Sequence, residues 1–100
     1  MKNAYAVIFS SERNDNDLSG YEETAYHMVE LAKTQKGFLD IESVRDNNGI
    51  GITISYWETL EDIQNWKKNE EHLVAQQRGK SDWYKSFKVK ICKIEREYEF

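Results

Sequence analysis

The sequence predicts an α+β fold of the ferredoxin-like type, in which a four-stranded antiparallel sheet carries two helices on one face. Three observations lead to this prediction: short apolar runs typical of strands, two stretches with helical periodicity, and an Asn-Gly pair between two strand-like runs. Their order along the chain is βαββαβ. The chain has 100 residues, a length that supports one small hydrophobic core. We therefore expect a single domain that spans residues 1–100.

The first strand and the first helix are expected in the N-terminal third of the chain. Residues 4–9, AYAVIF, form a short apolar run rich in β-forming residues, which indicates a buried strand. The segment 10–20 is polar and turn-forming, and it separates this strand from a helix over residues 21–35. Ser19 is the expected N-cap of the helix, because Glu22 completes the capping box.

A β-hairpin is expected near the middle of the sequence. Asn48-Gly49 lies between two strand-like runs, residues 38–45 and 50–57, and both residues of the pair tolerate the positive φ of a hairpin turn. In the second run, isoleucines at alternate positions and Tyr56 share one face. This alternation predicts a strand with one strongly apolar face.

The last third of the chain predicts a second helix and a final strand. Thr59 is the expected N-cap of the helix, and Asp62 occupies the third helical position. The helix extends to residue 77, either continuously or with a break at Asn69, which would then cap a fresh segment. Residues 86–96 carry apolar side chains on both faces and form the last strand.

The predicted strands are apolar on both faces, as the neighbours Val7 and Ile8, or Ile91 and Cys92, illustrate. Two helices cover only one face of a four-stranded sheet, so the other face needs a second cover. A second copy of the chain is the simplest cover. We therefore expect a homodimer packed sheet to sheet.

Composition limits the partners and the compartment. The net charge of −4 disfavours nucleic acids and anionic membranes, because both bind basic surfaces. No stretch approaches the ~20 apolar residues of a membrane span, and the N-terminus lacks the apolar core of a signal peptide. The single cysteine, Cys92, cannot form an internal disulfide, which fits a reducing compartment. We therefore expect a cytoplasmic protein that binds neither nucleic acid nor membrane.

The chain resembles, over nearly its whole length, the antibiotic biosynthesis monooxygenase (ABM) superfamily of dimeric α+β barrel proteins. The residues that carry the resemblance are Gly37-Phe38-Leu39, residues 55–58 (SYWE), Trp66, His72, Ala75, Gly79 and Trp83-Tyr84. The resemblance implies a dimer with a pocket between sheet and helices in each subunit. It also implies one of two activities, the oxidation of aromatic phenols by O₂ without a cofactor or the degradation of haem.

The haem-degrading pattern of this superfamily matches the chain poorly. Haem degraders of the staphylococcal type use an Asn on the first strand, a Trp on the second helix and a His ten residues after that Trp. Trp66 matches the Trp, whereas Gln76 occupies the position of the His. The first strand offers Val7, Ile8 and Phe9 where the Asn belongs. Haem is therefore the disfavoured cofactor, and we expect that none is required.

His72 and Trp66 are the expected catalytic residues. A neutral imidazole at His72 would serve as a base or a haem ligand, and a helix that restarts at Asn69 would disfavour the imidazolium through its dipole. Trp66 would form one wall of a pocket for a flat ligand. The alternative for His72 is an ordinary helix residue without a ligand. The alternative for Trp66 is a core residue, because it shares a helix face with Ile63 and Leu73.

Four further aromatic residues are expected to bind the substrate: Phe9, Tyr56, Trp57 and Trp83. For Trp57 and Trp83, the alternative is that they pack over the uncovered face of the sheet or at a dimer contact. The whole set could equally form a hydrophobic pocket without any chemistry. No set of Cys, His and carboxylate residues has the spacing of metal ligands, so we expect no metal site.

Together, the residues and the resemblance predict a monooxygenase that oxidises a small aromatic or quinone-like compound with O₂. Such chemistry needs a dry aromatic pocket, a fixed orientation and one base. The same residues would also suit a non-enzymatic small-ligand-binding or stress-response dimer, or an atypical haem-binding or haem-degrading protein. The fold by itself does not separate these alternatives.

Overall fold

The computed structural model of the chain describes residues 3–13, 18–76 and 84–100, and it describes the side chains of these ranges except at positions 18–21, 24 and 71–76. The elements are β1 (Tyr5–Arg13), α1 (Leu18–Lys33), β2 (Phe38–Arg45), β3 (Ile50–Trp57), α2 (Leu60–Gln76) and β4 (Tyr84–Lys93). This order confirms the predicted βαββαβ arrangement.

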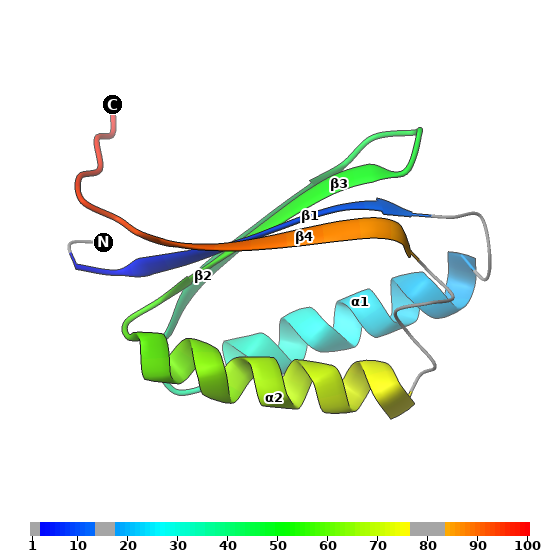
Figure 1. Cartoon of the computed structure of the whole chain (residues 1–100), viewed down its shortest axis with the longest axis horizontal. Helices are drawn as coiled ribbons and strands as arrows, with labels where there is room; N and C mark the ends of the chain where they lie inside the picture. Colours follow the sequence, from blue (N-terminus) through cyan, green and yellow to red (C-terminus); the bar gives the residue numbers. More distant parts are fainter. Residues whose placement is uncertain (1–2, 14–17, 77–83) are drawn as a thin grey trace.

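The four strands form one antiparallel sheet in the order β2-β3-β1-β4. Both helices lie on the same face of this sheet, and the other face carries no helix (Figure 1). The C-terminal residues 94–100 run on past the end of β4, away from the helices (Figure 1). The predicted ferredoxin-like fold is therefore confirmed.

Two element boundaries in the N-terminal part differ from the predictions. Strand β1 continues through Ser10–Arg13, which were predicted to belong to a linker because they are polar. These residues extend the strand because it lies between two neighbours: Ser11, for example, pairs with Gly51 of β3 and with Phe87 of β4. Helix α1 begins at Leu18, so Ser19 lies inside the helix and the prediction that it caps the helix was wrong.

Helix α2 is continuous from Leu60 to Gln76, without the break considered at Asn69. The Asn69 side chain instead donates a hydrogen bond from Nδ2 to Oε1 of Gln35, at 2.8 Å, and so links α2 to the end of α1. The predicted N-cap is confirmed, because Thr59 Oγ1 accepts a hydrogen bond of 3.1 Å from the backbone N–H of Asp62.

The β2–β3 hairpin is confirmed, but its loop is longer than a two-residue turn. The backbone N–H of Asp46 donates to the carbonyl of Ile50 at 2.9 Å, which leaves residues 47–49 as the loop. Only Gly49 in this loop has a positive φ, of 88°. The Asp46 carboxylate accepts hydrogen bonds from the backbone N–H groups of Asn48 and Ile50, both at 2.9 Å, and holds the loop closed.

The core lies between α2 and one end of the sheet. Trp57 at the end of β3 is fully buried. Its ring stacks on that of Trp66, with centroids 5.8 Å apart, and meets the ring of Phe38 edge to face at 5.7 Å. Ala32 and Ile63 complete this buried cluster. The cluster fixes the position of α2 over the sheet.

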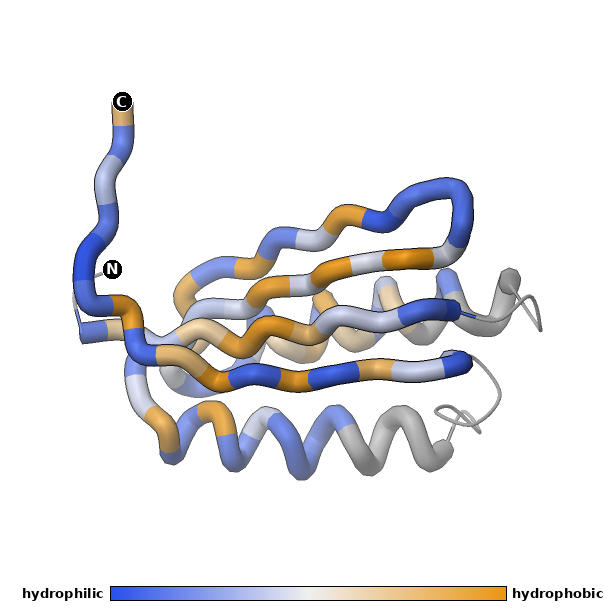
Figure 2. Tube along the Cα trace, turned by 45° about the horizontal axis from the view of Figure 1, so that its top comes forward, coloured by the Kyte–Doolittle hydropathy of each residue, from blue (hydrophilic) through white to orange (hydrophobic). Residues whose placement is uncertain are grey.

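The apolar face of β3 is the face that the helices leave uncovered, which we name the open face. Ile50 and Ile52 are about half exposed on it, and Val44 on the neighbouring β2 is 71% exposed. Apolar residues alternate with polar ones along the strands (Figure 2). Cys92, which the sequence places on one of the two apolar faces of the last strand, is exposed. The predicted second apolar face is therefore present.

Candidate functional site

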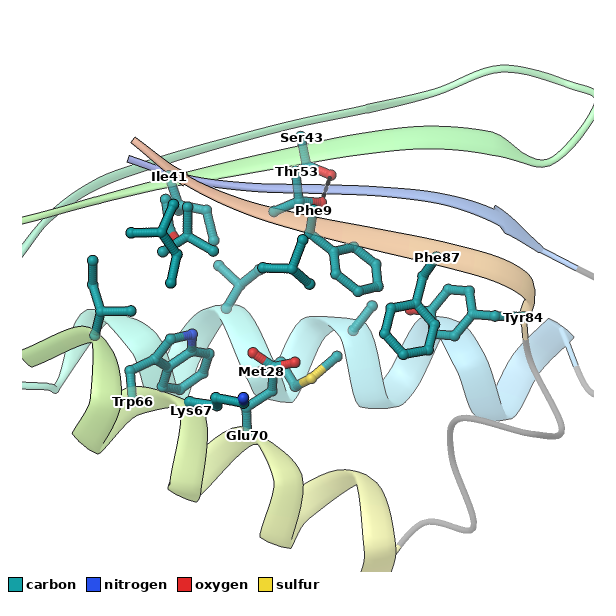
Figure 3. Close-up of a pocket in the computed structure, with 17 residues that line it drawn as sticks. Phe9, Met28, Ile41, Ser43, Thr53, Trp66, Lys67, Glu70, Tyr84 and Phe87 are labelled. Atoms are coloured by element: carbon teal, nitrogen blue, oxygen red, sulfur yellow. Dashed lines mark hydrogen bonds between the residues drawn. The ribbon is translucent and has the colours of Figure 1, made fainter. Parts of the chain in front are cut away.

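A cavity of about 330 Å³ lies between the sheet and the two helices, next to the buried tryptophan cluster (Figure 3). Its volume lies at the lower end of the range typical of small-molecule sites. All four strands and both helices contribute to its lining. The lining residues are Val7, Phe9, Ala25, Met28, Val29, Ile41, Ser43, Thr53, Ser55, Ile63, Trp66, Lys67, Glu70, Tyr84, Phe87, Val89 and Ile91.

Aromatic rings bound the cavity from two sides. Phe9 of β1 stacks with Phe87 of β4, with centroids 5.6 Å apart, and meets Tyr84 edge to face at 5.5 Å. The ring of Trp66 borders the cavity from α2 (Figure 3). Ring faces and edges of this kind bind flat apolar molecules well. The cavity is therefore suited to a small aromatic ligand.

Three hydroxyl groups on β2 and β3 interrupt this apolar lining, and Tyr84 adds a phenolic hydroxyl from β4. Ser43 Oγ of β2 and Thr53 Oγ1 of β3 lie 2.8 Å apart and share a hydrogen bond across the strands (Figure 3). Ser55, two residues further along β3, is buried, and its Oγ accepts a hydrogen bond of 2.9 Å from Nε1 of Trp57. These hydroxyls form a short polar strip in a mostly apolar cavity.

The charged residues of the lining, Lys67 and Glu70, both come from α2 (Figure 3). Glu70 is half-buried and Lys67 is exposed. Neither residue was predicted to belong to the site. Their spacing from Ile63 and Trp66 follows the i, i+3, i+4, i+7 pattern of one helix face. That pattern was the available signal, and it would have placed both charges beside the predicted tryptophan.

The structure brings together only some of the residues predicted for the site. Phe9 and Trp66 both line the cavity. Trp57 is fully buried and packs behind Trp66 without lining the cavity. His72 belongs to α2, but its side chain lies outside the described part of the chain, as does Trp83 altogether. The catalytic and binding roles of these residues stay predictions.

Tyr56 lies apart from the predicted aromatic residues that line the cavity, and its binding role stays a prediction. Successive strand residues point to opposite faces of a sheet, and the neighbouring Ser55 lines the cavity, so Tyr56 lies on the open face. Partial burial raises the pKa of the Tyr56 phenol, and the negative charges of Glu42, Asp40 and Glu97 raise it further. Tyr56 is therefore a residue of the open face.

Among residues 3–13, 18–76 and 84–100, no group of three or more His, Cys, Asp and Glu side chains lies close enough to hold a metal ion. Neither helix, over its described residues, has the length and apolar character needed to cross a bilayer.

Comparison with known proteins places the chain among relatives of the same fold. The family model for antibiotic biosynthesis monooxygenases matches residues 5–78. The uncharacterized protein YqjZ of Bacillus subtilis (strain 168) is 49% identical over 96 residues, which are 96% of this chain and 83% of YqjZ.

Two solved structures illustrate the match in three dimensions. SnoaB, a cofactor-independent oxygenase from Streptomyces nogalater, aligns with a TM-score of 0.75 at 8% identity, over 95% of this chain and 96% of SnoaB. PA3566 from Pseudomonas aeruginosa aligns with a TM-score of 0.75 at 16% identity, over 94% of this chain and 96% of PA3566. At such low identities, these two similarities establish the shared fold.

Proposed function

This chain belongs to the antibiotic biosynthesis monooxygenase family, and from this premise we propose that it oxidises a small aromatic or quinone-like compound with O₂ and without an obligatory cofactor. The observation that carries the proposal is the cavity of about 330 Å³, bounded by aromatic rings and bordered by the charged residues Lys67 and Glu70. The similarity in fold to SnoaB, a cofactor-independent oxygenase, supports the absence of a cofactor.

The proposed substrate is a phenol that carries a hydrogen on the carbon para to its hydroxyl. One oxygen atom of O₂ becomes a carbonyl oxygen at that carbon, and the other leaves as water. The hydrogens of that water come from the phenolic O–H and from the para C–H. The phenol supplies all four electrons that reduce O₂, so the reaction needs no external reductant. The protein has to bind the ring, exclude water and remove the phenolic proton.

We propose Glu70 as the base that removes this proton, with His72 as the alternative. Glu70 lines the cavity and is half-buried, so a phenol bound in the cavity would lie beside this residue. An α-helix turns by roughly 100° per residue, and α2 is continuous, so position 72 is roughly 160° around the helix axis from position 70. The spacing therefore favours Glu70 over the sequence-based choice of His72.

Oxygen uptake with 1-naphthol tests both the activity and the base. The protein, treated with a chelator, is compared with Glu70→Gln, His72→Gln and the control Glu61→Gln, which changes an exposed glutamate in the first turn of the same helix. We expect Glu70→Gln to slow the reaction about 100-fold or more, and the other two variants to keep most of the rate. Loss of activity in His72→Gln alone would assign the base to His72. Absence of uptake by the unmodified protein would favour a non-enzymatic binding protein.

We propose further that the chain forms a homodimer through the open face, because charge and hydrophobicity on this face are self-complementary. One row across the sheet runs Glu42, Ile54, Ile8, Lys90, from β2 at one edge to β4 at the other. An acidic edge, an apolar centre and a basic edge thus follow one another. A two-fold axis parallel to the strands would place β2 of one copy over β4 of the other, so that opposite charges meet around an apolar centre.

Light scattering tests this arrangement through a charge swap. The unmodified protein is expected at twice the mass of one chain at micromolar concentration. Glu42→Lys and Lys90→Glu should each weaken the dimer, because each places like charges opposite one another, and the double variant should restore it. A monomeric unmodified protein would contradict the dimer. Equal weakening in the double variant would contradict the proposed pairing of the edges.

A further inference from the structure

We propose that the Ser55 hydroxyl, assisted by the Ser43–Thr53 pair, donates the hydrogen bond that orients the substrate by its oxygen atom. This inference rests on the proposed function, because it assumes an aromatic ligand that carries an oxygen. It starts from the direction of the hydrogen bond between Trp57 and Ser55. An indole N–H is only ever a donor, so Ser55 Oγ must be the acceptor in this bond of 2.9 Å.

The Ser55 hydroxyl therefore keeps its own hydrogen for another partner. Within the described parts of the chain, no acceptor for this hydrogen is present among the hydrogen bonds of Ser55. The residue is 6% exposed and borders the cavity. A hydroxyl that has lost most of its contact with water gains free energy from an acceptor that enters the cavity. The oxygen of a phenol or a quinone is such an acceptor.

The rigid surroundings of Trp57 fix the position of this donor. The indole is fully buried and lies between the rings of Trp66 and Phe38, so its N–H direction is set by packing. Ser55 itself lies on β3, which pairs with a strand on each side. A donor held in this way loses little conformational freedom when a ligand binds, which strengthens its contribution to selectivity.

The Ser43–Thr53 pair supplies a second donor on the same strip. The two hydroxyls have two hydrogens, and the bond between them, of 2.8 Å, uses one (Figure 3). Thr53 and Ser55 are two residues apart on β3, so their Cα atoms are separated by roughly 7 Å. The rings of Phe9, Phe87 and Trp66 form the walls around this strip. The other polar groups of the lining lie elsewhere, the Tyr84 phenol on β4 and the Trp66 indole N–H, Lys67 and Glu70 on α2. The oxygenated edge of a ligand is therefore expected to lie on β3, with its ring against these walls.

Equilibrium dialysis under anaerobic conditions tests the inference without any turnover. The probes are 1-naphthol and naphthalene, which share a ring system and differ by one hydroxyl. We expect the unmodified protein to bind 1-naphthol more tightly than naphthalene. In Ser55→Ala, the ratio of the two affinities should fall about tenfold, because 1-naphthol binding weakens while naphthalene binding changes little. The matched control is Ser10→Ala, a serine on the open face of β1. Thr53→Val keeps the shape of the side chain and is expected to reduce the preference less.

A second variant separates ligand binding from stability, because Ser55→Ala alone leaves the buried Trp57 N–H without an acceptor. Trp57→Phe removes that N–H and keeps the serine, so it should retain the preference for 1-naphthol. The double variant Trp57→Phe/Ser55→Ala has no unpaired indole, and it should lose the preference. Equal loss of both ligands in Ser55→Ala, or an unchanged preference in the double variant, would overturn the inference.

The outcomes also distinguish this inference from the proposed function. A preference that depends on Ser55 in a protein that consumes no O₂ would support the inference and refute the oxygenase activity. Oxygen consumption with a preference independent of Ser55 would refute the inference alone. Failure of the unmodified protein to bind either ligand would refute both.

Discussion

Substitution of Gly37 by alanine is predicted to destabilise the fold strongly, because two independent effects coincide at this position. Gly37 has a φ of 83°, a conformation that residues with a Cβ rarely adopt. A Cβ added here would overlap with Oδ2 and Cγ of Asp62, and it would lie 2.8 Å from the Asp62 Cβ. The carbonyl of Gly37 also accepts a hydrogen bond of 2.8 Å from the N–H of Glu58. The turn before β2 is thus tied to the segment before α2.

The expected cost follows from these two effects. A left-handed conformation costs an L-residue roughly 1–2 kcal/mol. The overlap forces the Asp62 side chain, which is 4% exposed, out of its place, and such overpacking typically costs about 1–3 kcal/mol. The sum of about 2–5 kcal/mol is a large fraction of the ~5–15 kcal/mol by which small domains are stable.

Urea unfolding followed by circular dichroism measures this cost. A double-mutant cycle with Asp62 separates the part caused by the positive φ from the part caused by the overlap. Asp62→Ala removes the overlapping Oδ2 and Cγ atoms and keeps the Cβ, so Gly37→Ala should cost less in that background but still more than the φ penalty alone. A Gly37→Ala variant whose free energy of unfolding lies within ~0.5 kcal/mol of that of the unmodified protein would show that neither the φ nor the overlap matters. If the changes in unfolding free energy caused by Gly37→Ala and Asp62→Ala were strictly additive, the overlap would not contribute to the cost.

Three smaller predictions concern the cap of α2, the Asn69 side chain and the Tyr56 phenol. Thr59→Ala removes the N-cap of α2 and should cost about 1 kcal/mol in urea unfolding, whereas no loss would contradict the cap. Asn69→Ala breaks an exposed hydrogen bond to Gln35 and should cost no more than about 1 kcal/mol. The raised pKa of Tyr56 means that its neutral form is favoured in the folded state, so stability should fall as pH rises above about 10. Tyr56→Phe should remove that part of the pH dependence, and an unchanged profile would contradict it.

Local signals sufficed for most of the fold. The Asn48-Gly49 pair and the alternation after it located the β2–β3 hairpin, and the structure confirms both flanking strands. The Thr59 cap located the start of α2. Ser10–Arg13 were missed as strand because their polarity is typical of a loop, whereas pairing with β3 and β4 decides their conformation. Pairing of this kind is a tertiary effect, which a single sequence does not reveal.

The candidate site was predicted less completely than the fold. Aromatic character pointed to Phe9 and Trp66, which do line the cavity. The same criterion selected Tyr56, because alternation separates the two faces of β3 without telling which face the helices cover. Ser55 was not predicted as a site residue, because a small polar residue that alternates with isoleucines along a strand is typical of the solvent-exposed face. Its role emerges only from the Trp57 bond and the cavity next to it.

Incorporation of isotopically labelled O₂ into the product is the decisive measurement for cofactor-independent oxygenase activity in this cavity. Chelator-treated protein is mixed with 1-naphthol and labelled O₂, and the quinone is analysed by mass spectrometry at early times. We expect one labelled oxygen in the quinone, and no product above background with Ala25→Phe, which fills the cavity at a position on α1. Background-level product with the unmodified protein, or equal labelling in the cavity-filled variant that retains its fold, would contradict the assignment of a cofactor-independent oxygenase to this cavity.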